Sequence, residues 1–259
     1  MDYARQIVDR YWSIRMGVCI PDVKAGQVAV ATCDRRTYGE LGFSCRPLWV
    51  MHLGDRAMVS VHPAALAEVS RLAFGRDPNM VLDGGFMAEA YAALTSALPS
   101  ARLSHPPQSE GDMGIKFYHP GNAPEVSGEG EVRLLTAADV DKWPGPRGGM
   151  PAGTLPCAAR GEAFGLFLDD LCVAEVMTHD TAVAEMAHLI ADDGIEVAQE
   201  YRGRGYGKAI FSAWTREMQR RGRVCLHGTW VGNAGSVGLA RSVGYIEYAR
   251  NWSIHPEDD

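Results

Sequence analysis

The chain has 259 residues, of which 46% are hydrophobic and 22% charged, and it carries a formal net charge of −7. This composition excludes an intrinsically disordered protein, and the length is sufficient for two domains that each bury a core. The negative charge argues against broad contact with a nucleic-acid backbone, although a local basic patch could hold one anionic ligand.

The first 103 residues are expected to form an α/β domain whose role the sequence does not reveal. Apolar patterning predicts strands at residues 26–33, 47–53 and 56–61, and helices at residues 63–74 and 86–98. Gly54-Asp55 predicts a hairpin turn between the second and third strands. A stretch rich in Pro, Gly and Ser, residues 104–130, is expected to be a linker.

Residues 131–259 are expected to form a second domain. Its first part is predicted as a strand, a short helix capped by Thr136, a Pro/Gly-rich loop and a hairpin, over residues 131–135, 136–143, 144–156 and 163–177. Three further strands are predicted at residues 194–198, 223–230 and 245–254. Two helices, at residues 208–221 and 234–243, separate them, and the first carries an apolar stripe that packs on a sheet.

A strand, a turn and the glycine-rich start of a helix follow one another over residues 195–208, IEVAQEYRGRGYGK. The first turn of a helix leaves about four backbone N–H groups unpaired and carries about half a positive charge, which suits a diphosphate. The three glycines let phosphates approach these amides, while Arg202, Arg204 and Lys208 add positive charge. The GxGxG spacing matches neither the dinucleotide fingerprint nor the nucleotide-hydrolase phosphate loop.

Arg202 to Gly207 (RGRGYG) fits the signature [RQ]xxGx[GA] of the GNAT superfamily of acyl-CoA-dependent N-acyltransferases. Residues 233–245 (NAGSVGLARSVGY) also resemble that family's second motif, an Asn-led helix that closes with Gly and an aromatic residue. The resemblance covers residues 131–254 and implies an α/β (α+β) fold, a mixed twisted sheet flanked by helices. It also implies an enzyme that transfers acetyl from acetyl-CoA to a primary amine by direct attack in a ternary complex.

By this resemblance, the coenzyme phosphates lie on the glycine turn and the pantetheine arm extends the sheet beside residues 195–198. An N–H group near Val197 would polarise the thioester carbonyl. Asn233 either contacts the arm or only caps its helix. The residues expected to bind acetyl-CoA are Ile195, Val197, Ala198, Arg202, Gly203, Arg204, Gly205, Tyr206, Gly207, Lys208, Asn233 and Ser236.

The amine must lose a proton before it attacks, because an amine with a pKa of about 10 is mostly protonated at neutral pH. Glu196, on the central strand, is our first candidate for the general base, with His227 and Glu185 next. Trp230 is a further candidate, as a wall of the acceptor pocket. The loop at residues 144–156 lies where the family gathers acceptor-binding segments.

The family's tyrosine that protonates the departing thiolate is replaced by Ala240. Water, Tyr245, Tyr248 or Ser236 could supply that proton instead, or the thiolate leaves unassisted. The missing tyrosine also motivates an alternative function, a catalytically inactive acyl-CoA-binding sensor or regulator. A second rival is a serine hydrolase, because AGSVG around Ser236 approximates GxSxG, with Glu247 and His255 as the remaining partners.

The sequence also predicts where the protein is located and whether it binds a metal. The N-terminus lacks a basic start with an apolar run, and no stretch approaches the roughly 18 apolar residues of a membrane span, so we expect a cytoplasmic protein. The spacing of the six cysteines and of the histidines predicts no metal site.

The N-terminal half is interpreted either as a degenerate acyltransferase copy or as an acceptor-binding or dimerisation module. A small-molecule amine, an amino acid, a polyamine or a protein N-terminus is the expected acceptor.

Overall fold

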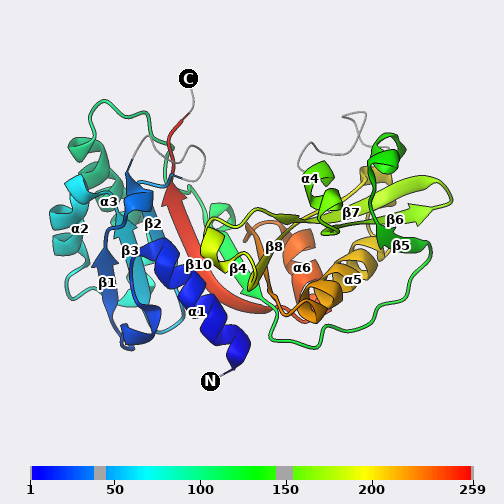
Figure 1. Cartoon of the computed structure of the whole chain (residues 1–259). Coiled ribbons are helices and arrows are strands. Elements are labelled where there is room, and N and C mark those ends of the chain that lie inside the picture. Colours follow the sequence, from blue (N-terminus) through cyan, green and yellow to red (C-terminus); the bar gives the residue numbers. More distant parts are fainter. Residues whose placement is uncertain (1, 38–44, 144–153, 258–259) are drawn as a thin grey trace.

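The structure is a computed structural model that describes residues 2–37, 45–143 and 154–257. One mixed, ten-stranded sheet runs through the molecule in the order β1-β3-β2-β10-β4-β9-β8-β7-β6-β5, with helices on both faces (Figure 1). The strands are β1 (Val28–Ala31), β2 (Leu48–His52), β3 (Ala57–Val61), β4 (Gly114–Tyr118), β5 (Glu131–Leu134), β6 (Ala163–Leu168), β7 (Leu171–His179), β8 (Ile190–Val197), β9 (Val224–Trp230) and β10 (Ile246–Ile254). The α-helices are α1 (Tyr3–Met16), α2 (Leu66–Ala73), α3 (Gly84–Ala97), α4 (Thr154–Ala159), α5 (Tyr206–Arg220) and α6 (Ala234–Val243).

The N-terminal part of the sheet is covered on both faces. The predicted hairpin is confirmed as β2 and β3, which pair antiparallel across a turn at Gly54 with φ +80°. Leu48 and Val50 pack in the cluster that contains α2 and α3, whereas Trp49 and Met51 pack in the cluster that contains α1. This alternation follows from the two-residue period of a strand.

Helix α1 was not predicted. Its buried residues Val8, Tyr11, Trp12 and Met16 recur at helical spacing, and the Asp2 side chain accepts a hydrogen bond from the N–H of Ala4 at its start. The helix ends where Gly17 adopts a left-handed conformation at φ +68°.

Strand β10 joins the two halves of the chain, because it pairs antiparallel with β2 on one side and with β4 on the other. Strand β4 lies within residues 104–130, which were predicted as a linker, and four of its five residues are buried. The sheet is therefore continuous from β1 to β5. The division of the chain into two domains stays a prediction.

Most elements of the C-terminal half match the predicted ones. The apolar stripe of α5, which includes Phe211 and Trp214, is buried as predicted. Strand β8 begins at Ile190, earlier than predicted, and residues 137–142 form a 3-10 helix. The predicted loop at residues 144–156 was wrong for its last three residues, which begin α4; residues 144–153 lie outside the described residues. None of the helices in the described ranges is long and apolar enough to cross a membrane.

Candidate functional site

Strands β8 and β9 separate at their carboxyl ends. Their parallel ladder has only three residue pairs, of which Asp192 with Leu226 is the last, although β8 continues to Val197 and β9 to Trp230. The other edge of β8 stays paired with β7 as far as Val197. Among the described residues, the edge that faces β9 therefore has no strand partner beyond Asp192, and an extended ligand can be accommodated along it.

The glycine turn leads from β8 into α5 and depends on two left-handed residues. Gly203 has φ +77° and Gly205 has φ +88°, and a Cβ atom at either position would meet nothing within 4 Å. The glycines are therefore required by backbone conformation and not by protein crowding. At Gly207 the reason is different, because a Cβ atom would lie 3.2 Å from Val197 Cγ2.

The backbone N–H groups of residues 203–208 have no hydrogen-bond acceptor among the described residues. The first backbone hydrogen bond of α5 runs from Ala209 N–H to Gly205 O, over 3.1 Å, and Gly205 provides no side-chain cap. Within the described part of the chain, none of the six N–H groups before Ala209 donates to an acceptor in any turn, cap or ladder. Unpaired N–H groups and the positive end of a helix dipole are features that favour an anion at this turn.

One cavity of about 660 Å³ adjoins the turn, the open edge of β8 and the start of α6. Glu196 lines it together with ten of the twelve residues predicted to bind the coenzyme: Ile195, Val197, Arg202, Gly203, Gly205, Tyr206, Gly207, Lys208, Asn233 and Ser236. The two exceptions are Ala198, which is buried in the hydrophobic cluster that also contains Trp143, and Arg204, which donates to Glu200 O. Arg202 lines the cavity but its Nε donates to Val197 O over 2.9 Å, which ties the turn to β8.

Ser236 belongs to a hydrogen-bonded network that the sequence analysis did not predict. Its Oγ lies 2.8 Å from His227 Nε2, and His227 Nδ1 lies 2.9 Å from Asp193 Oδ1. With the Nδ1–H group donating to the carboxylate, Nε2 of the neutral ring accepts from the serine hydroxyl. Burial lowers the pKa of His227, but the charge of Asp193 and the hydrogen bond to it outweigh burial and raise that pKa above its ordinary value.

This arrangement also changes the expected role of His227. The side chain is only 4% exposed and both ring nitrogens have partners, so it cannot contact an amine directly. Instead it positions Ser236, whose N–H group donates to Asn233 Oδ1 at the start of α6. Asn233 therefore caps its helix and lines the cavity as well.

The two tyrosines proposed as sources of a proton lie outside the cavity. Ala240, which stands at the position of the family's tyrosine, is fully buried in the core. Tyr245 is hydrogen-bonded to Thr215 over 2.8 Å, and Tyr248 donates to Asp9 over 2.9 Å. Burial raises the pKa of both tyrosines well above the ordinary value. Of the protein groups suggested by the sequence, Ser236 is the one on the cavity wall.

Glu196 has a second carboxylate beside it. Glu175 on β7 is its direct partner in the antiparallel ladder, so the two side chains lie on the same face of the sheet. Glu175 is 2% exposed and accepts a hydrogen bond from Thr154 Oγ1 over 3.1 Å. Burial raises the pKa of Glu175 to about 7, the hydrogen bond from Thr154 opposes this, and the charge of Glu196 adds to it.

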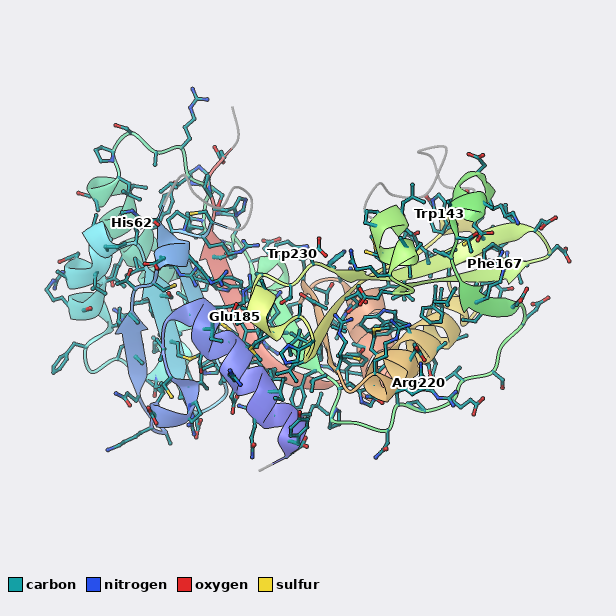
Figure 2. All side chains as sticks on the ribbon, viewed as in Figure 1. His62, Trp143, Phe167, Glu185, Arg220 and Trp230 are labelled. Atoms are coloured by element: carbon teal, nitrogen blue, oxygen red, sulfur yellow. The ribbon has the colours of Figure 1, made fainter. Side chains whose placement is uncertain are left out.

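The remaining sequence candidates are placed elsewhere. Glu185 lies in a 3-10 helix that leads to the Ile190 end of β8, away from the cavity. Glu247 pairs with Arg241 and Arg250, and His255 is hydrogen-bonded to Ser104, so neither approaches Ser236 as the serine-hydrolase hypothesis required. Trp230 is 61% exposed in the middle of the molecule, between its two halves (Figure 2). Within the described ranges, no cluster of three acidic, His or Cys side chains is placed to hold a metal ion.

Comparisons with known proteins give no sequence relative: no family model matches the chain, and no curated protein does. Similar folds occur among solved structures. A GNAT-family acetyltransferase from Colwellia psychrerythraea is 16% identical, with a TM-score of 0.47 over 64% of this chain and 61% of that one. An N-acetyltransferase from Sphaerobacter thermophilus is 15% identical, with a TM-score of 0.45 over 78% and 71% of the two chains. A tandem GNAT protein from the clavulanic acid biosynthesis pathway is 14% identical, with a TM-score of 0.40 over 65% and 59%.

Proposed function

We propose that this protein is an acyl-CoA-dependent N-acyltransferase that moves an acetyl or similar acyl group to a primary amine. The observation that carries the proposal is the run of unpaired N–H groups at residues 203–208, which opens onto the same cavity as the free edge of β8. A ligand that combines a diphosphate with an extended, amide-containing arm satisfies both features at once. Lys208 adds a positive charge to the cavity wall.

The thioester carbonyl carbon is the electrophile in the proposed reaction, and the protein positions groups around it. Glu196 accepts the proton of the incoming amine, directly or through a water molecule. Glu175 lies opposite Glu196 in the ladder and so places a second carboxyl group beside the base. Because its pKa is raised to about 7, this carboxyl group remains partly protonated near neutral pH. A backbone N–H of β8 near Val197 stabilises the negative charge that develops on the carbonyl oxygen.

Ser236 donates the proton to the departing thiolate in this proposal and so replaces the tyrosine that Ala240 displaces. The hydroxyl lies on the cavity wall. In the protonated ring, His227 Nε2–H donates to Ser236 Oγ, so the hydroxyl proton passes to the thiolate, the Nε2 proton replaces it, and the ring that Asp193 orients becomes neutral. Asp193 favours the protonated ring, because its charge and hydrogen bond raise the pKa of His227. Proton donation of this kind contributes typically about 10²- to 10⁴-fold to a rate.

The experiment that tests the proposal measures thiol release from acetyl-CoA by the purified protein with and without a panel of primary amines. We expect release that depends on added amine, together with an acetylated amine detected by mass spectrometry. Coenzyme binding without turnover across the panel would contradict the proposal and support an acyl-CoA sensor.

A second candidate function is hydrolysis of the thioester, which the Ser236, His227 and Asp193 arrangement favours. Ser236 Oγ would attack the thioester carbonyl while His227 takes the hydroxyl proton; the C–S bond breaks, the thiolate receives that proton, and water then cleaves the acyl-serine ester. Thiol release without amine, with an acetyl adduct on Ser236, would support hydrolysis. Amine-dependent release with unmodified Ser236 would support N-acyl transfer. The cytoplasmic location and a homodimer stay predictions from the sequence.

A further inference from the structure

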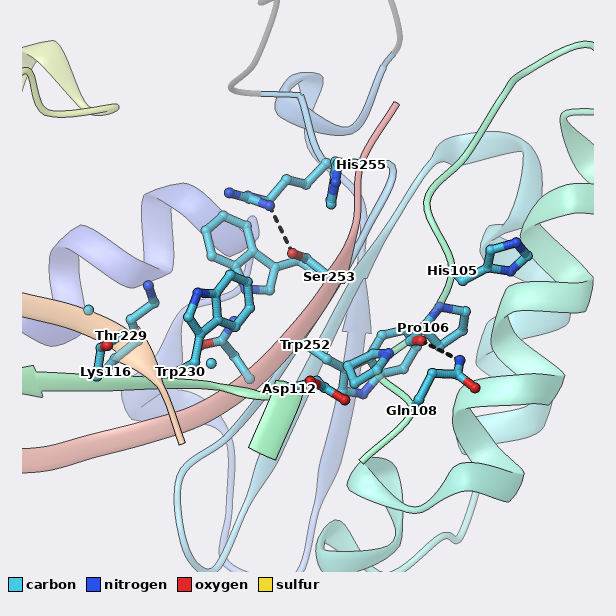
Figure 3. Close-up of a pocket in the computed structure, with 16 residues that line it drawn as sticks. His105, Pro106, Gln108, Asp112, Lys116, Thr229, Trp230, Trp252, Ser253 and His255 are labelled. Carbon is cyan, nitrogen blue, oxygen red and sulfur yellow. Dashed lines mark hydrogen bonds between the residues drawn. The ribbon is translucent and has the colours of Figure 1, made fainter. Parts of the chain in front are cut away.

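A second cavity, of about 540 Å³, lies where the N-terminal half of the chain meets β4, β9 and β10 (Figure 3). Arg46 and Trp49 come to it from the N-terminal half, Lys116 from β4, Trp230 from β9 and Asn251 from β10. The site therefore depends on the arrangement of both halves around one sheet.

This cavity lies on the same face of the sheet as the proposed base. Lys116 is the direct ladder partner of Gly228, and Leu226 is the partner of Asp192. Because side chains alternate along a strand, Trp230 shares its face with Leu226, and Glu196 shares its face with Asp192. An amine bound in the cavity can therefore approach the open β8 edge from the side on which Glu196 stands.

A group of four cations adjoins the cavity without a compensating ion pair. The guanidinium carbons of Arg15, Arg36 and Arg46 lie 4.5, 5.5 and 4.9 Å from the centre of the Trp49 ring. Lys116 is the fourth cation. Within residues 2–37, 45–143 and 154–257, none of the four takes part in an ion pair.

Arg36 shows how unusual this group is. It is only 1% exposed, yet among the described residues its donors reach only neutral acceptors. These acceptors are Ser60 Oγ, Met16 Sδ and the backbone oxygens of Arg15, Arg35 and Arg46. A buried charge without an opposite charge is unfavourable, so an anionic ligand near this group would be strongly favoured.

Three residues on the cavity wall also keep a buried polar atom without a hydrogen-bond partner among the described residues: Arg46 Nε, Trp49 Nε1 and Asn251 Oδ1. Each such atom costs about 1–3 kcal/mol when nothing satisfies it. The only other polar atoms of this kind in the described ranges are on Thr32 and His52. Their concentration at one cavity points to a polar ligand.

Asp112 and Asp192 are acids near these cations, and among the described residues neither forms an ion pair with them, although the charge of Asp192 acts on Lys116 and Arg15. Asp112 lines the cavity, but its Oδ2 accepts from the Ser109 hydroxyl over 2.8 Å. Burial lowers the pKa of Lys116 to about 8, and the charge of Asp192 opposes this without an ion pair between the two. Burial likewise lowers the pKa of Arg46, with Arg15 adding to the effect. A bound anion would reverse both shifts.

We infer that this cavity binds a carboxylate carried by the acceptor, so that the acceptor is a small amino-acid-like amine. The inference rests on the proposed function and names its substrate class. Arg46 and Lys116 hold the carboxylate, while Trp49 and Trp230 provide apolar walls for the body of the molecule. A polyamine is repelled by the same charges, and the cavity volume fits a small molecule.

The test uses wild-type protein with acetyl-CoA and compares each acid with its own amide: L-phenylalanine with L-phenylalaninamide, and L-leucine with L-leucinamide. We expect kcat/KM to be about 10- to 100-fold higher for the acids, the range for a charged hydrogen bond. A further pair, β-alanine and 2-aminoethyl phosphate, separates a carboxylate from a phosphate. Equal values for acids and amides, or a preference for the phosphate, would overturn the inference.

Two substitutions in the cavity provide a second, independent test of carboxylate binding. Arg46→Gln and Lys116→Met are each expected to raise KM for the acids by about tenfold or more and so to reduce the difference in kcat/KM between each acid and its amide. Arg71→Gln, on the exposed surface of α2, is the matched control. Thermal melting shows whether each variant is folded, and the wild-type comparison does not depend on them.

Failure of the inference and failure of the proposed function give different results. Acetylation of amines without preference for acids overturns only the inference. If no amine is acetylated, the proposed function fails, and tryptophan fluorescence with L-phenylalanine and its amide then decides the inference. Equal binding of the two would overturn it, and tighter binding of the acid would support it.

Discussion

Ser236 Oγ lies 2.8 Å from Nε2 of His227, an imidazole that is 4% exposed. The ring is held from its other side by Asp193, and of these three side chains the serine alone lies on the cavity wall. Because of this position, Ser236 is the proton donor in the proposed reaction. It takes the role of the family's tyrosine, whose place in the sequence is occupied by Ala240.

Replacing Ser236 by Ala is expected to lower kcat by about 100-fold, because the thiolate then leaves without its proton donor. The affinity for coenzyme A should change much less than kcat, because the backbone N–H groups of residues 203–208 still bind the diphosphate in this proposal. Thiol release under saturating amine and calorimetry with coenzyme A measure the two quantities. Ser242→Ala is the control, because that hydroxyl is exposed on the same helix and donates to Leu239 O. An unchanged kcat in Ser236→Ala would show that another group donates the proton.

Replacing Asp193 by Asn is expected to lower the pKa of His227 below its ordinary value of 6.5. Burial, which lowers the pKa, remains in this variant, whereas the carboxylate charge that outweighs it is lost. In the wild type the raised pKa contributes stability that is fully present below the unfolded pKa and is lost as pH rises through the folded pKa. NMR titration of the imidazole protons measures the shift. A His227 pKa that does not fall in the variant contradicts this account of the ring.

Glu175 is expected to make the folded state less stable as pH rises. Its pKa is about 7 in the folded protein against an ordinary value of 4.5. Between these values the unfolded chain loses the proton while the folded protein keeps it, so the free energy of unfolding falls by roughly 3 kcal/mol as pH rises. Urea unfolding of wild type and Glu175→Gln at pH values on either side of this window measures the effect. The same pH dependence in both proteins would refute it.

Replacing Gly205 by Glu is expected to abolish coenzyme A binding, because a carboxylate would then occupy the anion site. Gly222→Glu at the other end of α5 is the matched control, since both glycines are left-handed, with φ +88° and +78°, and a Cβ atom at either would meet nothing within 4 Å. The backbone strain is therefore similar in the two variants. Calorimetry should show binding in the control alone; undiminished affinity in Gly205→Glu would argue strongly against the proposed site.

Most residues that the sequence predicts for coenzyme binding line one cavity, because the signals that mark them are local. The left-handed Gly203 and Gly205 directly precede the start of α5, so their spacing alone predicts an anion-binding turn, and Asn233 is a separate local signal for the start of α6. The hydrogen-bonded network of Asp193, His227 and Ser236 is not local in this way. Asp193, His227 and Ser236 come from β8, β9 and α6, and only the parallel pairing of β8 with β9 brings the first two together.

Glu175 and strand β4 were not predicted from the sequence, and the reason can be given for each. Glu175 stands in the apolar run LCVAEVMTH, and a lone carboxylate in a buried strand is the signal that could have marked it. Strand β4 was hidden because GIKFY lies among prolines and glycines, whose composition is typical of a linker. Without β4, the continuity of the sheet and the cavity around Lys116 could not be anticipated.

The structure of the protein in complex with coenzyme A tests the central claim most directly. We predict that the diphosphate oxygens accept hydrogen bonds from backbone N–H groups of residues 203–208 and that the pantetheine arm lies along the β8 edge that faces β9. A diphosphate bound elsewhere, with those N–H groups left without a ligand, would contradict the account.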